Sequence, residues 1–580
     1  MKKWMRYVKP YKLYFILGPL CMLVEVFGEV FMPKLMAQII NNATIGEGSL
    51  GINFGIMFAM ILTAVLMMVG GVGGAYFGAK ASVNFASDLR LDVYKKVQSY
   101  SFSNIDKYST GSLVTRLTND VTQMQNMVNM LLRMALRSPG MLIGALIMAI
   151  TLRPSLAVVL AVTIPLMVIA IIFLIVKSFP RFTLKQKKID ALNSTVQENI
   201  TNVRVVKSFV REDYEKQKFA AANRELKESG MSSMKLMILM SPVMTLFMNF
   251  TTIAVLWFGS EMVYASGMPY GDLSAFITYV SQILSSLMMV TMLFMMLSRA
   301  MASARRIREV LDEKVDLSDE TAKQKELLVK DGGIEFKDVS FRYYKNSEDP
   351  VLDHINLTIK PRSTVGVIGS TGCGKTTLVS LIARLYDADE GQVLIDGVDV
   401  RDYSLYNLRE GVGMVLQKNV LFSGSIEDNL RWGDENASME EIEAACESAQ
   451  ANKFVLSFKG GYSYDLGQGG KNVSGGQKQR LCIARALLKK PKIIILDDST
   501  SAVDTATEAQ IRKAFREDLS DSTKIIIAQR ISSVMDADEI VIMNEGKITG
   551  IGTHSELLKG NTEYQEIYYS QMESNRKEGA

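Results

Sequence analysis

Long apolar stretches fill the first 300 residues of this 580-residue chain, and shorter strand-like and helix-like patches alternate in the remainder. A helix needs about 20 mainly apolar residues to cross a bilayer. Six stretches reach that length, near residues 13–40, 54–80, 132–151, 156–177, 236–265 and 271–300. The pattern therefore predicts an α-helical membrane domain of six transmembrane helices.

The hydropathy pattern also predicts how the chain is divided. The membrane domain is expected over residues 1–305, and a mixed α/β domain is expected over 332–572. Between them, residues 306–331 are charged and poor in aromatic residues, as a linker should be. Residues 573–580 form a short polar tail.

Basic residues predict the orientation of the membrane domain, because Lys and Arg gather in cytoplasmic loops. Lys2, Lys3 and Arg6 precede the first apolar stretch, and both long connections, second-to-third and fourth-to-fifth, are rich in lysine and arginine. The short outer loops contain one basic residue, Arg153. We expect a multi-pass protein of the cell membrane whose N-terminus and α/β domain are cytoplasmic.

Two glutamates interrupt the first apolar stretch. Glu25 and Glu29 are four residues apart and therefore share one helix face. Charges in hydrocarbon are costly, and they usually face a cavity or pair with each other. Two interpretations remain open: the glutamates line a cavity for cationic substrates, or they lie near the outer interface or pair with a neighbouring helix.

Composition narrows the range of partners and cofactors. The net charge of +4 is small, and the basic residues form no stripe with interleaved aromatics, so nucleic acid is not expected as a partner. The four cysteines have no paired spacing, which argues against a zinc site or a disulfide framework. Membrane lipids are the expected surroundings of the apolar half.

The α/β half contains a phosphate-binding loop, Gly-Ser-Thr-Gly-Cys-Gly-Lys-Thr, at 369–376. The loop follows an apolar strand and precedes a helical run, which is the context that a P-loop requires. Backbone N–H groups and the helix N-terminus would bind the phosphates of ATP, Lys375 would reach the β- and γ-phosphates, and the Thr376 hydroxyl would ligate Mg²⁺. The expected ATP contacts are Gly369, Ser370, Thr371, Gly372, Cys373, Gly374, Lys375, Thr376 and Thr377.

Three further residues have positions that suit a nucleotide site. Asp497 ends a hydrophobic strand and is expected to contact Mg²⁺. Gln417 ends another apolar run and could reach both the metal and the attacking water. Tyr343 precedes the P-loop and could stack on adenine, although most strand aromatics belong to a core.

The segment Val-Ser-Gly-Gly-Gln at 473–477 gives the most specific signal. With it, the chain resembles an ABC transporter half of the exporter type, in which six spans precede a P-loop nucleotide-binding domain. The resemblance implies that two such domains enclose two ATP molecules, and that short contact helices at 102–108 and 202–209 meet these domains. It assigns to the partner's nucleotide the signature residues Ser474, Gly475, Gly476 and Gln477. It places the D-loop at Ser501 and Asp504.

Two residues depart from the family pattern. Asp498 stands where the family usually has a glutamate that polarises the attacking water, and Gln529 stands where it usually has a histidine. The carboxylate of Asp498 is one methylene short, and an amide cannot cycle through a protonated imidazole. We expect Asp498 to be a weak base and ATP binding to survive.

The two departures together resemble the degenerate-site half of bacterial heterodimeric multidrug ABC exporters. That resemblance implies a non-identical partner half-transporter that carries the catalytic glutamate and the histidine, and a cargo of amphiphilic drugs or lipids. The alternatives are a slow homodimeric exporter or lipid flippase, and an ATP-gated membrane channel or regulator.

Overall fold

The computed structural model describes residues 2–45, 50–265, 267–345, 347–498 and 505–578. The chain forms two compact units. The helical unit comprises Met1–Val97 and Gly111–Asp312, and the sheet unit comprises Gln98–Thr110 and Glu313–Ala580. The short segment Gln98–Thr110 therefore belongs with the sheet although helices of the other unit flank it in sequence.

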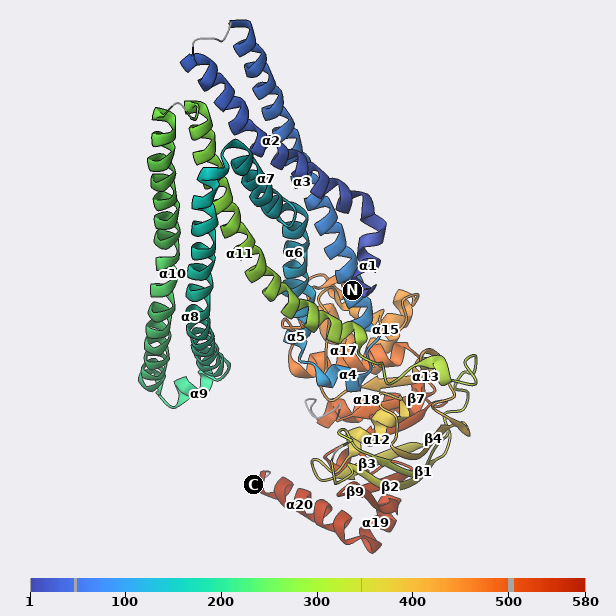
Figure 1. Cartoon of the computed structure of the whole chain (residues 1–580). Coiled ribbons are helices and arrows are strands. Elements are labelled where there is room, and N and C mark those ends of the chain that lie inside the picture. Colours follow the sequence, from blue (N-terminus) through green and yellow to red (C-terminus); the bar gives the residue numbers. More distant parts are fainter. Residues whose placement is uncertain (1, 46–49, 266, 346, 499–504, 579–580) are drawn as a thin grey trace. The chain divides into compact units, whose positions relative to one another are not determined.

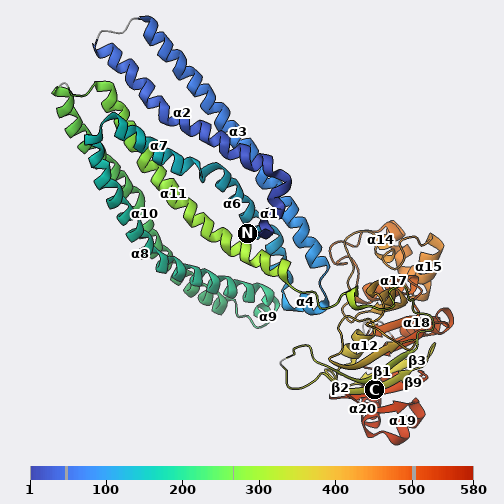
Figure 2. The same ribbon diagram turned by 45° about the vertical axis from the view of Figure 1, so that its right-hand side comes forward.

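The helical unit is built from long helices (Figures 1 and 2). They are α1 (Lys2–Val8), α2 (Lys12–Ile45), α3 (Leu50–Gln98), α5 (Thr110–Thr115), α6 (Val121–Met134), α7 (Arg137–Leu152), α8 (Pro154–Thr201), α9 (Val203–Ser208), α10 (Glu212–Tyr264) and α11 (Tyr270–Asp312), with a 3₁₀ turn at Lys9–Tyr11 and a π-helical turn at Arg116–Asp120. Among the described residues, six helices are long and apolar enough to cross a membrane, which confirms the six expected spans. Helix α11 continues to Asp312, so the segment expected as a linker begins inside a helix.

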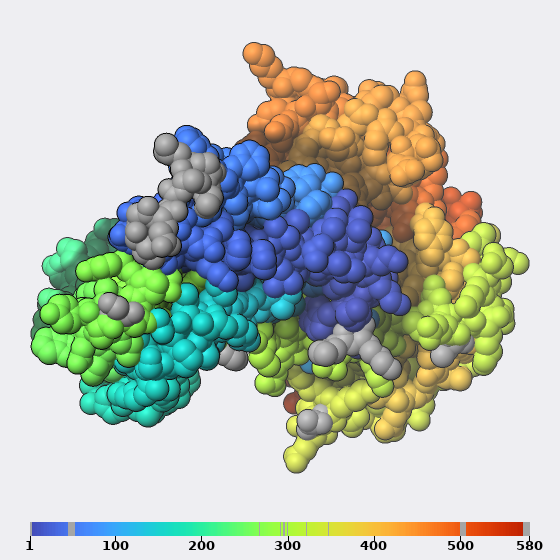
Figure 3. Space-filling view, turned by 45° about the horizontal axis from the view of Figure 1, so that its top comes forward, coloured from blue at the N-terminus to red at the C-terminus, as the bar shows by residue number. Residues whose placement is uncertain are grey.

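Most side chains of these helices face outwards rather than into a core. Large apolar side chains such as Phe27, Phe58 and Trp257 are about two-thirds to three-quarters exposed, as suits helices surrounded by lipid. The buried part centres on α11, whose Phe276, Tyr279 and other apolar side chains pack with those of α7, α8 and α10. Helix α2, dark blue in Figure 3, packs directly against the cyan α7.

The sheet unit contains two sheets and their covering helices. Its strands are β1 (Ile334–Phe341), β2 (Leu352–Ile359), β3 (Thr364–Gly369), β4 (Glu390–Ile395), β5 (Val398–Asp399), β6 (Val412–Val415), β7 (Ile493–Asp497), β8 (Thr523–Ile527), β9 (Glu539–Asn544) and β10 (Lys547–Gly552). Its α-helices are α4 (Phe102–Lys107), α12 (Lys375–Ile382), α13 (Leu405–Gly411), α14 (Ile426–Leu430), α15 (Met439–Ser448), α16 (Asn452–Ser457), α17 (Gly475–Leu488), α18 (Thr505–Asp518), α19 (His554–Gly560) and α20 (Thr562–Glu578), with 3₁₀ turns at Asp319–Thr321, Gly461–Ser463 and Ile531–Ser533.

The larger sheet brings distant motifs to one edge. Its strand order is β10-β9-β3-β8-β7-β6, and the strands from β9 to β6 are parallel, whereas β10 pairs antiparallel to β9. The smaller antiparallel sheet has the order β2-β1-β4-β5. In parallel sheets, ligands bind beyond the carboxyl ends of the strands. That edge holds the ends of β3 at Gly369, β6 at Val415, β7 at Asp497 and β8 at Ile527.

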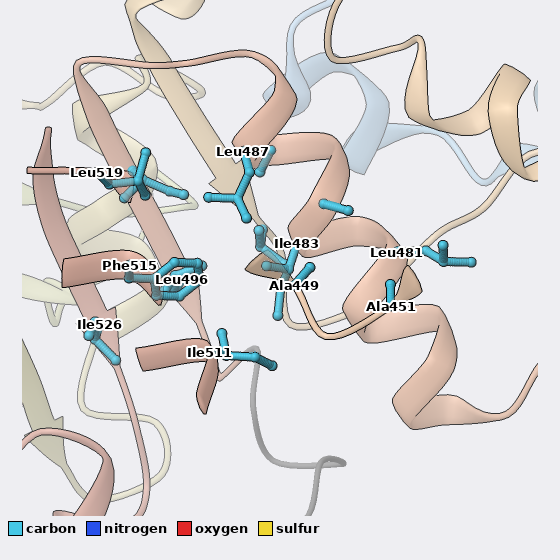
Figure 4. Packing of buried hydrophobic residues seen from close by; sticks show 14 of the residues in the cluster. Ala449, Ala451, Leu481, Ile483, Leu487, Leu496, Ile511, Phe515, Leu519 and Ile526 are labelled. Atoms are coloured by element: carbon cyan, nitrogen blue, oxygen red, sulfur yellow. The ribbon is translucent and has the colours of Figure 1, made fainter. Parts of the chain in front are cut away.

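A buried apolar cluster supports this edge (Figure 4). Leu496 of β7 and Ile526 of β8 alternate with side chains that face the other side of the sheet, and they pack with Phe515 of α18 and with Ile483 and Leu487 of α17. Every residue of β7 and of β8 is buried, as is usual for central parallel strands. The packing therefore fixes the carboxyl ends of these strands rigidly.

Candidate nucleotide site

The loop between β3 and α12 has the geometry of an anion-binding loop. Gly372 and Gly374 have φ values of +89° and +98°, a backbone region that favours glycine. Lys375 begins α12, and its Nζ donates to the carbonyl oxygens of Gly369 at 2.8 Å and Ser370 at 2.7 Å. The ammonium group is thus held at the mouth of the loop, next to the helix N-terminus where phosphate oxygens bind.

Thr376 and Asp497 form a pair that suits Mg²⁺. The Thr376 hydroxyl donates to Oδ1 of Asp497 at 3.1 Å, and Asp497 is only 2% exposed. Its other oxygen, Oδ2, is buried with no hydrogen-bond partner among the described residues. Burial raises the pKa of Asp497, and the adjacent charge of Asp498 raises it further. A carboxylate oxygen lacking a donor beside a hydroxyl fits the oxygen ligands that Mg²⁺ prefers.

The two residues that depart from the family pattern bind each other. Nε2 of Gln529 donates to Oδ2 of Asp498 at 2.9 Å. Burial raises the pKa of Asp498, while the charge of Lys375 and the side chains of Gln417 and Gln529 act in the opposite direction. Asp498 has a φ of +47°, a conformation that Asp tolerates better than most residues. The sequence placed Asp498, Gln529 and Gln417 near one site but did not indicate that the Gln529 amide donates to this carboxylate.

Tyr343 lies beside α12 at the rim of this site. Its hydroxyl and that of Thr377 are 3.0 Å apart, and the ring is 43% exposed. Thr377 itself is buried, so its hydroxyl supports Tyr343 rather than the open face of the loop. Tyr343 also makes edge-to-face contacts with Phe341 at 5.0 Å and with Tyr386 at 5.2 Å between ring centroids.

Tyr386 connects Tyr343 to the short helix α4. The Tyr386 hydroxyl donates to Oδ2 of Asp106 at 2.7 Å, and its ring lies 6.2 Å from that of Phe102. Helix α4 is itself attached to the segment after α11, because Nδ2 of Asn104 donates to the Lys314 carbonyl oxygen at 2.9 Å. The first expected contact helix therefore does contact the sheet unit. No motif marks Tyr386, and sequence reasoning missed it.

The signature segment starts helix α17 at the surface. The Ser474 hydroxyl accepts from the Gln477 N–H at 3.3 Å, and the Ser474 N–H donates to Oε1 of Gln477 at 2.9 Å. This capping box fixes the serine, while Ser474 and Gly475 remain exposed and nothing lies within contact distance of an added Cβ at Gly475. The expected D-loop residues, Ser501 and Asp504, lie outside the described residues.

Comparison with known proteins identifies the family. Residues 15–287 match the model of the ABC transporter transmembrane region, and residues 352–501 match the ABC transporter model. The uncharacterized ABC transporter ATP-binding protein YfiB of Bacillus subtilis is 38% identical over 573 residues, which cover 99% of both chains. This chain belongs to the ABC transporter family.

Two further comparisons extend over most of this chain. The ATP-dependent lipid A-core flippase of Desulfotalea psychrophila is 32% identical over 524 residues, covering 89% of this chain and 91% of the flippase. A solved structure, of a bacterial Atm1-family ABC exporter with ATP bound, has a TM-score of 0.77 and 24% identity, with 98% of each chain covered. The chain thus has the fold of that exporter, with an ABC transporter transmembrane region fused to an ATP-binding domain.

The intramembrane charges of this transporter are paired across two helices. Nη2 of Arg137, on α7, lies 3.2 Å from Oε1 of Glu25 and 2.8 Å from Oε1 of Glu29. Of the two interpretations of the glutamates, pairing with a neighbouring helix is the one that the structure contains. The cluster has two acids for one base, and Oε2 of Glu29 and Nε of Arg137 are buried without a hydrogen-bond partner among the described residues.

Proposed function

We propose that this chain is the degenerate-site subunit of a heterodimeric ABC exporter that moves amphiphilic drugs or lipids out of the cytoplasm or the inner leaflet. In this proposal the subunit binds ATP and Mg²⁺ at its own P-loop. It lends Ser474 and Gly476 to the nucleotide bound by a non-identical partner, whose glutamate and histidine hydrolyse it.

The hydrogen bond of 2.9 Å between Gln529 and Asp498 is the main support. A general base needs a free lone pair directed at the water from which it takes a proton. Here Oδ2 of Asp498 accepts from the Gln529 amide. An amide neither takes up nor releases a proton near neutral pH. One acceptor position of Asp498 is therefore taken by Gln529, and the side chain also lacks the reach of a glutamate.

The groups that bind ATP are complete, in contrast to those that would cleave it. Lys375 can exchange its carbonyl partners for phosphate oxygens, and Thr376 and Asp497 present a hydroxyl and a carboxylate to Mg²⁺. When bound, the metal would neutralise phosphate charge, and these residues would hold and orient it. Binding without efficient hydrolysis is what a degenerate site requires.

The intact signature supports a role for this chain at a second site. Ser474 retains a full capping box and faces outwards, so its hydroxyl and the first turn of α17 are open to a partner's nucleotide. A chain that had lost its function altogether would have no need of this arrangement. The contact of α4 with Tyr386 would connect nucleotide binding to the membrane helices.

The proposed cargo follows from the membrane region and its relatives. Some similar proteins are named ATP-dependent lipid A-core flippases, which supports an amphiphilic or lipid cargo. The same relatives support the second candidate function, a homodimeric lipid flippase that hydrolyses ATP slowly with Asp498 as its base.

The test compares the purified chain with the complex that it forms. The partner is obtained by co-purification and mass identification, and ATP hydrolysis is measured for the chain alone and for the mixed complex. We expect the chain alone to hydrolyse ATP roughly 100-fold more slowly, the loss typical of a missing positioned base. Equal rates would refute the heterodimer and favour the homodimeric flippase.

Two variants then separate the two sites of the complex. Lys375→Ala should weaken ATP binding at the degenerate site. Ser474→Ala should instead reduce hydrolysis by the complex, because its effect falls on the partner's nucleotide. Ser438→Ala is the matched control, since Ser438 caps α15 with the same kind of capping box and has no place in the site. Equal effects of the Ser474 and Ser438 variants would contradict the role of the signature.

A further inference from the structure

Gln571 lies on helix α20. Its side chain hydrogen-bonds the backbone of Gln529 and of Ile531, the residues on either side of Arg530. Its Nε2 donates to the Gln529 carbonyl oxygen at 2.8 Å, and its Oε1 accepts from the Ile531 N–H at 2.9 Å. The chain leaves the sheet just before this point, where the Ala528 N–H donates to the Val367 carbonyl oxygen at 3.2 Å. Gln571 thus continues the hydrogen bonding of β8 beyond the end of the strand.

The position of Gln571 on its helix makes this contact stand out. Tyr564, Ile567, Tyr568 and Gln571 follow the spacing i, i+3, i+4, i+7, which places them on one face of α20. The first three pack on the core of the sheet unit, and the fully buried Tyr564 holds Nδ1 of His554 at 2.7 Å from its hydroxyl. Gln571 is the polar residue at the fourth position of this face. Its side-chain amide finds its hydrogen-bond partners in the backbone of Gln529 and Ile531.

The other end of α20 is fastened to the hairpin β9–β10. Glu563 accepts hydrogen bonds from Nδ2 of Asn544 at 3.0 Å and from the Thr549 hydroxyl at 2.5 Å. Helix α20 therefore runs from this hairpin to the segment that carries Gln529. A change at either end can reach the other through a helix whose apolar face is already packed.

We propose that Gln571 is a positioning residue of the nucleotide site, and that α20 controls through it where the Gln529 side chain points. With the backbone fixed on both sides of Arg530, the Gln529 amide is directed at Asp498, to which it donates at 2.9 Å. The proposal rests on the proposed function, that this site binds ATP, and adds the premise that Gln529 also donates to a γ-phosphate oxygen. A group that acts there discriminates ATP from ADP, because ADP has no γ-phosphate.

The first experiment measures binding of a non-hydrolysable ATP analogue and of ADP to the full-length chain in nanodiscs. Gln571→Ala should weaken binding of the ATP analogue about tenfold, the loss of one to two neutral hydrogen bonds, and leave ADP binding unchanged. Gln565→Ala is the matched control. Gln565 lies on the same helix, but its Nε2 donates to the Leu558 carbonyl oxygen, away from Gln529. A merely structural role would weaken both nucleotides equally, and that result would overturn the proposal.

A second variant gives a signature that folding defects do not produce. In Gln571→Glu, an ionised carboxylate still accepts from the Ile531 N–H but repels the Gln529 carbonyl oxygen, whereas a protonated carboxyl donates to it. Preference for the ATP analogue over ADP, relative to the unaltered chain, should therefore recover as the pH falls from about 7 to about 4, through the ordinary pKa of glutamate. Gln571→Ala should show no recovery. Identical pH profiles for the two variants would refute the proposal.

The outcomes remain separate from those that test the heterodimer. If the chain alone hydrolyses ATP as fast as the mixed complex, the proposed function fails, but the role of Gln571 still predicts weaker binding of the ATP analogue, and hence a higher KM for ATP, in Gln571→Ala. If the preference for the ATP analogue over ADP is unaltered in both Gln571 variants, the proposed role of Gln571 is refuted, and the proposal of a heterodimer is unaffected.

Discussion

If the proposed function holds, replacing Asp498 by glutamate and Gln529 by histidine should increase the rate at which this site hydrolyses ATP. The first change extends the carboxylate by one methylene, which is more than 1 Å of reach, and a misplacement of about 1 Å can cost roughly 100-fold in rate. The second removes the amide that donates to Asp498 at 2.9 Å and supplies a group that can exchange a proton. Because the two residues contact each other, their effects will not add. We expect the double variant to gain about 100-fold.

The structure also predicts what this exchange costs. Asp498 has a φ of +47°, where Asp is tolerated and a longer side chain is less favourable. Left-handed backbone at a residue other than glycine costs about 1–3 kcal/mol, and the exchange adds only part of that. A domain of this size would lose a few degrees in Tm. The stability loss is therefore too small to hide the gain in rate.

The assay measures phosphate release by the full-length chain in nanodiscs, at saturating ATP and Mg²⁺. The chain's own signature is intact, so a pair of identical chains can complete both sites. Lys375→Ala added to the double variant gives the background rate. Each single variant is measured beside the double variant. A double variant that binds ATP, and forms dimers, but hydrolyses no faster than the unaltered chain would refute the reasoning.

Three smaller changes test other contacts. Tyr386→Phe removes the hydroxyl that donates to Asp106 at 2.7 Å. The stimulation of ATP hydrolysis by cargo should fall up to about tenfold, and the Kd for ATP should be unchanged. The control Tyr406→Phe, at an exposed tyrosine, should have no effect. Arg137→Met leaves Glu25 and Glu29 without their cation and should destabilise the membrane region by on the order of 3 kcal/mol. Glu25→Gln removes the excess negative charge and should lower the stability far less. Both losses are measured by thermal unfolding, and equal losses would contradict the pairing. Asp497→Asn should abolish the gain in ATP affinity that Mg²⁺ gives, measured by binding with and without a chelator, and a persisting gain would exclude Asp497 as a ligand.

Patterns in neighbouring residues predicted much of this molecule. Apolar stretches of bilayer length predicted the six spans, because a transmembrane helix makes its backbone hydrogen bonds within its own segment. The P-loop was predictable because its glycines, its lysine and the start of its helix are consecutive residues. The role of Asp497 at the nucleotide site was predictable because it directly follows the consecutive apolar residues of its strand. The departures at Asp498 and Gln529 were visible as residue types but not as a contact.

The tertiary structure decided which distant residues meet. The register of β7 with β8 pairs Asp497 with Ile527, and this pairing brings Gln529 to Asp498 across 31 positions of sequence. Packing of α20 brings Gln571 to the same segment, and packing of α7 on α2 brings Arg137 to Glu25 and Glu29. None of these contacts has a local signature, because each depends on sheet order and side-chain packing. The sequence determined the spans and the phosphate loop. The tertiary structure decided that Gln529 donates a hydrogen bond to Asp498.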